Sequence, residues 1–378
     1  MSVGAGAEGF RTIGQEAAQL AVMRAAASGR LQRTLLIHGP AGAGKGSFTD
    51  DLLALLFCTD ADVGRRPCNA CRGCRFARQR AHPDLVIGSM DRWREQRSAG
   101  ESIVSAARRW LLESAGAPIA SERRVVLIEG IDRAGEQIQN ALLKVLEEPS
   151  PRQMFVLVAD EPSHILPTIR SRAQALRIGP VPQADLIEWL VDTHKLPQDQ
   201  ASAIARIADG MVGRAAGFVA TPGLLDWRRR TQAELLSLLR RGRAARFSSV
   251  RELLDEAARH ATPASLGAAE EPPAGAEQAT SLPSGQQRAA ALLIVDAWIG
   301  LTRDLLVAGA GRPQLAPSVQ LVDLASAEVG SVGRNGAGGL RSFLALLERI
   351  REGLRQNAAP RLALERAMLA WPAVGGTA

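Results

Sequence analysis

The sequence predicts an α/β domain plus an all-α region, and three observations support this. Apolar runs of strand length alternate with helical patterns over residues 1–178, which is typical of a parallel sheet covered by helices. A glycine-rich loop with a single lysine, Gly39–Gly46, follows the first of these runs. From Gly179 onward the apolar residues keep helical spacing and no strand pattern returns.

The composition is that of a soluble globular protein with two or three domains. The 378 residues are 46% hydrophobic and 22% charged, and the net charge is +7. No apolar run is as long as a membrane helix and the N-terminus lacks a signal-peptide pattern, so we expect a cytoplasmic protein without a membrane partner. The 43 arginines and three lysines are compatible with nucleic-acid contact but do not by themselves indicate it.

The loop Gly39–Gly46 has the G-x-x-x-x-G-K spacing of a phosphate-binding loop. Backbone N–H groups of such a loop surround the phosphates of a nucleotide, and the lysine reaches the terminal ones. Thr34–His38 is expected to be the strand that enters the loop, and Phe48–Phe57 the helix that leaves it. The predicted nucleotide-binding residues are Gly39, Gly42, Gly44 and Lys45.

Two groups that ATP hydrolysis requires are missing from the sequence. The residue after the lysine should be Ser or Thr, whose hydroxyl holds Mg²⁺, and it is Gly46. A motor ATPase ends a buried strand with Asp-Glu, but here the strand at Val125–Ile128 ends in Glu129 and Gly130. Glu129 could still reach a metal, whereas Gly130 cannot activate water. We therefore expect that ATP can be bound and that it is not hydrolysed.

All four cysteines lie close together, in the pattern C-x₉-C-x₂-C-x₂-C. We expect Cys58, Cys68, Cys71 and Cys74 to bind one structural Zn²⁺, because two C-x-x-C steps bring three thiolates to one tetrahedral ion and Cys58 returns as the fourth. Four cysteine ligands leave no open position for catalysis. Free cysteines, a redox pair and an iron–sulfur cluster are the less favoured alternatives.

Further strands and helices follow from the apolar spacing. A short strand is predicted at Leu85–Ile87 and buried strands at Arg124–Ile128 and Met154–Val158, with a helix at Gln137–Glu147 between the last two. The all-α region is expected to contain helices at 184–194, 198–208 and 214–220. Residues 262–287 are rich in Ala, Pro, Glu and Gly, which predicts a disordered insertion.

Several of these segments resemble bacterial clamp-loader ATPases, a family of AAA+ proteins. The run Asn140–Pro149 resembles their hallmark helix, and Ile169–Arg172 resembles their Ser-Arg-Cys motif, with Ala173 in the place of Cys. Phe10–Glu16 resembles the start of their AAA+ domain.

The cysteine module, followed by His82-Pro83-Asp84, is similar to that of the same family, although Cys58 and Cys68 stand one residue further apart than is usual there. Trp298–Leu306 and Asn357–Glu365 resemble the family's collar domain.

The resemblance implies a RecA-like AAA+ domain at 1–178 with a zinc module at 57–80, a small helical lid at 179–222 and a helical collar at 223–378 that contains the insertion 262–287. Five such subunits form a ring with ATP at the subunit interfaces. Arg172 would then be an arginine finger directed at nucleotide on a neighbouring subunit. The implied partners are the gamma/tau and delta subunits, the sliding clamp and primed template DNA, within the DNA polymerase III holoenzyme.

Two other functions remain open: a motor ATPase of gamma type, and a zinc-containing nucleic-acid binder outside replication. The roles of four further residues are also open. Asp160 is interpreted as a helix cap rather than a polar sensor, and Arg214 as either a nucleotide-sensing arginine or a structural one. Lys144 and Glu147, spaced i, i+3, are expected to form a surface pair.

Overall fold

The computed structural model describes residues 9–147, 150–261, 284–316, 336–356 and 358–372. The chain divides into two compact units, one comprising Met1–Trp189 with Gly210–Val212, the other Leu190–Asp209 with Gly213–Ala378. Residues 262–283 of the expected insertion lie outside the described residues, as do Glu148, Pro149 and Asn357 of the family motifs. Residues 284–287 are described and begin a helix.

The first unit is built on a five-stranded parallel sheet in the order β2-β3-β4-β1-β5. The strands are β1 (Thr34–His38), β2 (Leu85–Ser89), β3 (Arg124–Glu129), β4 (Gln153–Ala159) and β5 (Gln174–Arg177). The four predicted strands are therefore confirmed. The edge strand β5 has no clear sequence pattern, because only Leu176 of its four residues is buried.

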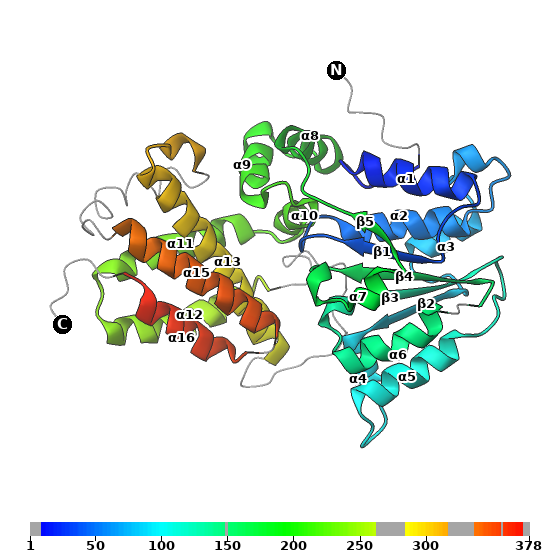
Figure 1. The fold of residues 1–378 in the computed structure, drawn as a ribbon. Helices are drawn as coiled ribbons and strands as arrows, with labels where there is room; N and C mark the ends of the chain where they lie inside the picture. The colour runs from blue at the N-terminus through cyan, green and yellow to red at the C-terminus, as the bar shows by residue number, and fades with distance from the viewer. Residues whose placement is uncertain (1–8, 148–149, 262–283, 317–335, 357, 373–378) are drawn as a thin grey trace. The chain divides into compact units, whose positions relative to one another are not determined.

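Helices cover both faces of this sheet (Figure 1). One face carries α1 (Glu16–Ala27), α2 (Lys45–Phe57) and α3 (Arg72–Arg78), and the other carries α4 (Met90–Glu95), α5 (Ile103–Ser114), α6 (Glu136–Glu147) and α7 (Pro167–Arg170). Three short 3₁₀ helices complete the unit, η1 (Val63–Arg65), η2 (Ile131–Arg133) and η3 (Pro162–His164). The carboxyl ends of the strands meet at one edge, where ligands bind in open α/β sheets.

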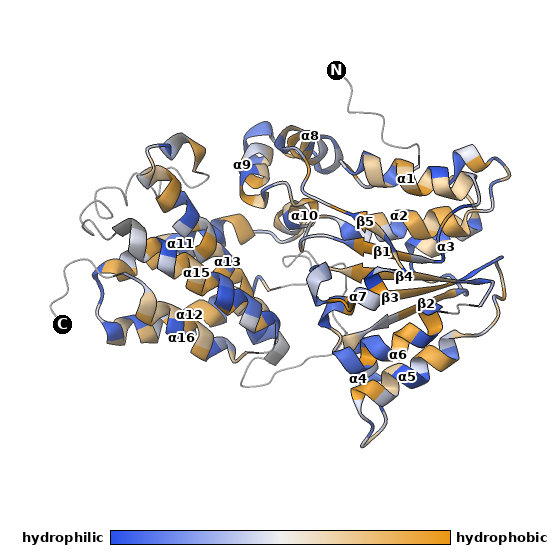
Figure 2. Cartoon of the chain, in the orientation of Figure 1, coloured by the Kyte–Doolittle hydropathy of each residue, from blue (hydrophilic) through white to orange (hydrophobic). Residues whose placement is uncertain are grey.

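The strands are apolar on both sides because both faces of the sheet are covered. In β1, Leu35 and Ile37 belong to the core beneath α2, whereas Leu36 belongs to the core on the opposite face. Successive strand residues point to opposite faces, so a continuous apolar run suits a sheet between two helical layers. Figure 2 shows this apolar character along the strands and a mixed colouring on the helices around them.

A buried carboxylate fastens the residue before β2 to the loop that precedes β3. Asp84 is fully buried and accepts hydrogen bonds from the N–H groups of Ile119 (2.6 Å) and Ala120 (2.8 Å) and from the hydroxyl of Ser121 (2.8 Å). Burial alone would raise the pKa of Asp84, but these donors outweigh it and hold the pKa below its usual range.

We expect this carboxylate to make the stability of the protein depend on pH in acid. Because the folded-state pKa lies below the unfolded value of about 3.9, the stabilisation is complete above that value and is lost as pH falls through the folded pKa. Asp84→Asn should lower the free energy of unfolding by about 2 kcal/mol at pH 7 and by less in acid. Urea unfolding of both proteins at several pH values measures the difference, and a difference that stays constant down to acid pH would contradict this account.

The second unit is helical throughout its described residues. Helix α8 (Gln183–His194) contains the boundary between the units, and the helices that follow are α9 (Gln198–Ala208), α10 (Val212–Ala220), α11 (Leu224–Ser237), α12 (Arg243–Ala258), α13 (Ser284–Gly309), α15 (Gly336–Arg355) and α16 (Pro360–Ala370), with η4 (Leu238–Arg240) and η6 (Pro313–Leu315). The predicted helices at 184–194, 198–208 and 214–220 correspond to α8, α9 and α10. None of the described helices has the length and apolar character needed to cross a membrane.

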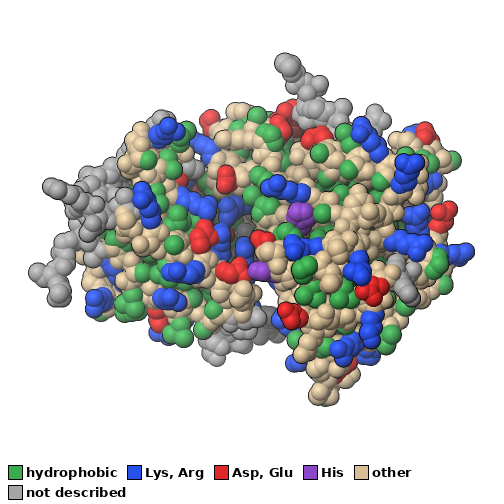
Figure 3. All heavy atoms as spheres, viewed as in Figure 1, with side chains coloured by type: hydrophobic (Ala, Val, Ile, Leu, Met, Phe, Trp, Pro, Cys, Tyr) green, Lys and Arg blue, Asp and Glu red, His purple; other side chains and the backbone are tan. Residues whose placement is uncertain are grey.

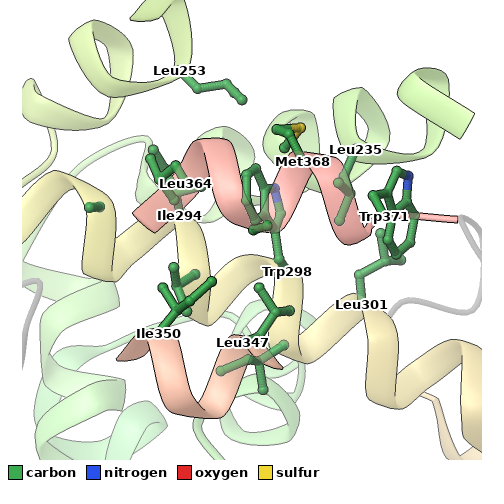
Figure 4. Close-up of a cluster of buried hydrophobic side chains, with 14 of the residues drawn as sticks. Leu235, Leu253, Ile294, Trp298, Leu301, Leu347, Ile350, Leu364, Met368 and Trp371 are labelled. Atoms are coloured by element: carbon green, nitrogen blue, oxygen red, sulfur yellow. The ribbon is translucent and has the colours of Figure 1, made fainter. Parts of the chain in front are cut away.

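Helices α11, α12, α13, α15 and α16 share one apolar core. Trp298 of α13 is fully buried there together with Leu347 of α15 and Met368 of α16 (Figure 4). At one end of this core the guanidinium of Arg246 donates to the carbonyl oxygens of Trp371 (2.6 Å) and Pro372 (3.0 Å), just beyond α16. A cation placed there satisfies carbonyl groups that the helix leaves unpaired.

Candidate nucleotide and metal site

The loop predicted to bind phosphate, Gly39–Gly46, lies between β1 and α2, at the carboxyl edge of the sheet. Gly44 has a left-handed backbone (φ +98°) and immediately precedes Lys45, the first residue of α2. A Cβ at Gly39 would lie 1.8 Å from the carbonyl oxygen of Ile178, so only glycine fits there. Gly42 also has a positive φ. The predicted loop residues thus stand together at the N-terminus of a helix, where N–H groups without helical partners favour an anion.

Lys45 is bound by groups of its own chain. Its Nζ donates to the carbonyl oxygens of Gly39 (2.7 Å) and Pro40 (2.9 Å), and it pairs with the Asp160 carboxylate at 2.6 Å. An ammonium group has three N–H donors, and these three acceptors occupy them. A phosphate that bonds to Lys45 would therefore have to displace one of these three acceptors.

The interpretation of Asp160 as a helix cap is wrong. Glu161 caps η3 instead, because its carboxylate accepts from the N–H of Ser163. The N–H of Asp160 donates to the Asp132 carboxylate at 3.0 Å. This bond holds the end of β4 in place, while the Asp160 side chain pairs with the lysine of the loop.

The acid at the end of β3, Glu129, forms an ion pair with an arginine. Nη1 of Arg80 lies 2.7 Å from the Glu129 carboxylate, and Nε lies 2.8 Å from the carboxylate of Asp50 in α2. Asp50 stands one helical turn after Gly46, on the same face of α2. Burial alone would lower the pKa of Arg80, but the carboxylates of Glu129 and Asp50 outweigh it and raise the pKa. Glu129 is therefore neutralised within the chain.

Arg80 holds this position with a strained backbone. Its φ is +53°, in the left-handed region, which costs on the order of 1–3 kcal/mol for a residue other than glycine. A divalent cation does not fit the residues present at this corner. Gly46 supplies no hydroxyl, and the carboxylates of Asp50 and Glu129 already share a guanidinium.

The four cysteines converge on one point, as the spacing predicts. Their Sγ atoms all lie within 4.8 Å of one another, and those of Cys58 and Cys71 are 4.0 Å apart. A tetrahedral zinc with Zn–S bonds of about 2.3 Å needs sulfurs about 3.8 Å apart. The set Cys58, Cys68, Cys71 and Cys74 therefore fits one tetrahedral ion.

Backbone N–H groups donate to the sulfurs of Cys58, Cys68 and Cys71. Cys68 N–H donates to Cys58 Sγ at 3.4 Å, Cys71 N–H to Cys68 Sγ at 3.4 Å, and Cys74 N–H to Cys71 Sγ at 3.3 Å. Burial alone would raise the pKa of Cys71, but donors from Thr59 and Cys74 outweigh it and lower the pKa to about 6. Burial instead raises the pKa of the Cys58 and Cys74 thiols. A bound cation would hold all four groups in the thiolate form that binds metal.

The cysteine module, residues 57–80, is tied to the rest of the unit through α3. Arg78 donates to the carboxylate of Asp51 in α2 at 2.7 Å. Asp51 is fully buried and also accepts from the N–H groups of Arg11 and Thr12. The module thus helps to hold both α2 and the segment before α1.

Arg172 lies two residues after α7, beside a surface groove. Its guanidinium donates to the carbonyl oxygen of Thr168 at 3.0 Å and pairs with Glu147 of α6 at 3.0 Å, and its side chain is 39% exposed. The groove is lined by Gln32, Arg33, Thr34, Leu146, Glu147 and Arg172. Glu147 thus pairs with Arg172 rather than with Lys144, the expected partner.

The sequence is similar to subunits of DNA polymerase III. It is 30% identical over 191 residues to DNA polymerase III subunit delta' of Bacillus subtilis, covering 50% of this chain and 54% of the relative. The Escherichia coli subunit delta' is 30% identical over 188 residues, with 50% and 54% covered. Residues 14–182 match the family described as DNA polymerase III, delta subunit. These residues are a domain of the DNA polymerase III delta-subunit family.

The chain spans about half the length of the curated delta' relatives that it matches. Subunit gamma/tau of Mycobacterium bovis is also 30% identical, over 160 residues that cover 42% of this chain and 26% of that one. Among solved structures, a gamma subunit-related protein of DNA polymerase III from Thermotoga maritima has a TM-score of 0.38 at 16% identity, covering 93% and 97% of the two chains. A RuvB mutant from the same organism has a TM-score of 0.35 at 17% identity, covering 58% and 63%.

Beyond the delta-family domain, Arg214 is engaged inside the second unit. It lies 3.4 Å from the carboxylate of Asp296, which also pairs with Arg351 at 3.5 Å. Arg214 therefore has a structural partner of its own in α13.

The sequence did not reveal the groups that neutralise the nucleotide site of the delta-family domain. Asp160 and Arg80 reach Lys45 and Glu129 through the fold, and no local pattern marks them. The sequence did contain one indication that Asp50 belongs to this site. Asp50 follows Gly46 by four residues and therefore lies on the same face of the helix.

Proposed function

We propose that this chain is the delta-prime subunit of a bacterial DNA polymerase III clamp loader, an AAA+ subunit that does not hydrolyse ATP itself. One observation carries the proposal: the two charged groups of the nucleotide site are both neutralised within the chain, Lys45 by Asp160 and Glu129 by Arg80. Gly46 and Gly130 supply neither a metal-binding hydroxyl nor a base. Such a loop can bind a nucleotide without providing the groups that activate water.

Arg172 is the residue through which the proposed subunit would act on the nucleotide of a neighbouring subunit. Its guanidinium is partly exposed and is held in place by Thr168 and Glu147. An arginine directed at the γ-phosphate on a neighbouring gamma/tau subunit would stabilise charge that develops in the transition state. The subunit thus contributes to catalysis at an interface while its own site stays inactive.

The proposed partners are the gamma/tau and delta subunits, with the sliding clamp and primed DNA as substrates of the assembled loader in the cytoplasm. The delta-prime and gamma/tau names of the relatives support this assembly. On the face shown in Figure 3 the basic side chains are spread among acidic ones. The four cysteines are proposed to hold one structural zinc ion, for which a set of four thiolates is suited.

The isolated chain should release no inorganic phosphate from ATP above the background rate. The reason is that the metal-binding hydroxyl and the water-activating carboxylate are absent while Lys45 and Glu129 are paired internally. A steady-state assay with the purified protein and with Lys45→Ala measures this. Turnover at the rate of a motor ATPase, abolished by Lys45→Ala, would overturn the proposal.

The second candidate is a gamma-type motor ATPase of the same complex. It is favoured by the retained Lys45 at the start of α2 and by the 30% identity to a gamma/tau subunit. The same phosphate-release assay separates the two candidates, because only the motor turns over without partners.

A further inference from the structure

We propose that Arg80 is a resident cation of the nucleotide site: it takes the place of the divalent metal, so that this chain binds nucleotide without Mg²⁺. The part concerning nucleotide rests on the proposed function, whereas the exclusion of metal rests on the geometry alone. The inference names a residue that determines which cation the site accepts.

Arg80 pairs with the acid that would be expected to hold a metal ion. In phosphate-binding-loop enzymes the metal is held by the hydroxyl after the lysine and by an acid at the end of another strand of the sheet. Here the hydroxyl position is Gly46, and the strand acid is Glu129 at the end of β3. The guanidinium of Arg80 joins Glu129 at 2.7 Å to Asp50 at 2.8 Å, one helical turn after Gly46. Arg80 therefore stands between the acid at the end of β3 and an acid one helical turn after the missing hydroxyl.

The charges of Asp50 and Glu129 already have a cation as partner. Mg²⁺ binds carboxylate oxygens through one or two direct ligands and several waters. Asp50 and Glu129 together provide two negative charges, a suitable beginning of such a site, but Arg80 already satisfies both. The three side chains are largely buried, with 20% to 26% of each exposed. Because screening by water is limited there, a second cation is repelled while the guanidinium remains.

The backbone of Arg80 is strained. A left-handed backbone at φ +53° favours glycine, yet the residue is an arginine. Its Nη2 is buried and makes no hydrogen bond to any residue that the structure describes. A strained residue with an unpaired donor is retained where its other contacts hold it firmly in that conformation. Here those contacts are the two carboxylates.

The test is binding of Mn²⁺, followed by electron paramagnetic resonance, to the full-length, zinc-loaded chain. The variants are Arg80→Gly and the double variant Arg80→Gly with Glu129→Gln. Glycine suits φ +53°, so Arg80→Gly should fold, which circular dichroism and zinc content verify. Wild type should leave Mn²⁺ free, Arg80→Gly should bind one ion at least about tenfold more tightly, and the double variant should lose that ion.

Lys195→Gly is the matched control, because Lys195 is another cation with a left-handed backbone (φ +56°). It should bind Mn²⁺ no better than wild type. Folded Arg80→Gly without a gain in Mn²⁺ binding would overturn the proposal. So would a wild-type chain that already binds one Mn²⁺ through Glu129.

Binding of a fluorescent ADP analogue gives the second measurement. Wild type should bind it equally in Mg²⁺ and in EDTA, within about twofold, whereas Arg80→Gly should bind it more tightly with Mg²⁺. A wild-type affinity that falls tenfold in EDTA would also overturn the proposal. Failure to assemble with gamma/tau would instead count against the proposed function, and the Mn²⁺ result does not depend on it.

Discussion

Replacing Arg172 with alanine should slow ATP hydrolysis by the assembled clamp loader while the complex still forms. An arginine supplied in trans accelerates phosphoryl transfer by about 10³–10⁵ at the site it serves. In the proposed complex each of the other nucleotide sites receives an arginine from a different subunit. The steady-state rate should therefore fall only by the contribution of the one site that Arg172 serves. Single-turnover measurements on the neighbouring gamma/tau site should show the larger loss.

The structure explains why this substitution should spare folding. Arg172 is partly exposed, and its ion pair with Glu147 lies at the surface, where such pairs contribute about 0–1 kcal/mol. Arg170→Ala is the matched control, since Arg170 is an exposed arginine in the last turn of α7. Hydrolysis should remain at the wild-type level in that control. An Arg172→Ala complex that hydrolyses ATP at the wild-type rate would remove the arginine-finger assignment.

Loss of the metal from the cysteine module should destabilise the first unit strongly. In Cys71→Ala, one of four ligands is gone, and structural zinc sites contribute directly to folding free energy. Once α3 is released, Arg78 no longer pairs with the fully buried Asp51, and breaking such a pair costs about 3–5 kcal/mol. We therefore expect the free energy of unfolding to fall by at least about 3 kcal/mol.

Elemental analysis should find one zinc per wild-type chain and none in Cys71→Ala, and urea unfolding measures the change in stability. Hydrogen exchange gives an independent readout, because the N–H groups of Arg11 and Thr12 are bound by Asp51 and should lose protection. Arg75→Ala, an exposed change in the same helix α3, should retain zinc and stability. A wild-type protein purified without zinc, or a variant as stable as wild type, would contradict the prediction.

The strands and the helices around the loop could be predicted because local patterns mark them. The run Val125–Ile128 is apolar on both faces, which suits a strand between two helical layers. The edge strand β5 escaped prediction because three of its four residues are not buried, so neither a continuous nor an alternating apolar pattern remains. The spacing of Cys58, Cys68, Cys71 and Cys74 was sufficient to bring their sulfurs together.

By itself, the sequence predicted a glycine-rich loop with a lysine between a strand and a helix, the absence of the groups for hydrolysis at Gly46 and Gly130, and the meeting of four thiols. These features depend on residues close in the chain, and spacing encodes them. Only the tertiary structure decided how the charges of the site are balanced. Arg80 reaches Glu129, which is 49 residues further along the chain, and Asp160 reaches Lys45 from the end of the adjacent strand β4. An ion pair depends on distance in space, and nothing in the local sequence distinguishes Arg80 from the other arginines.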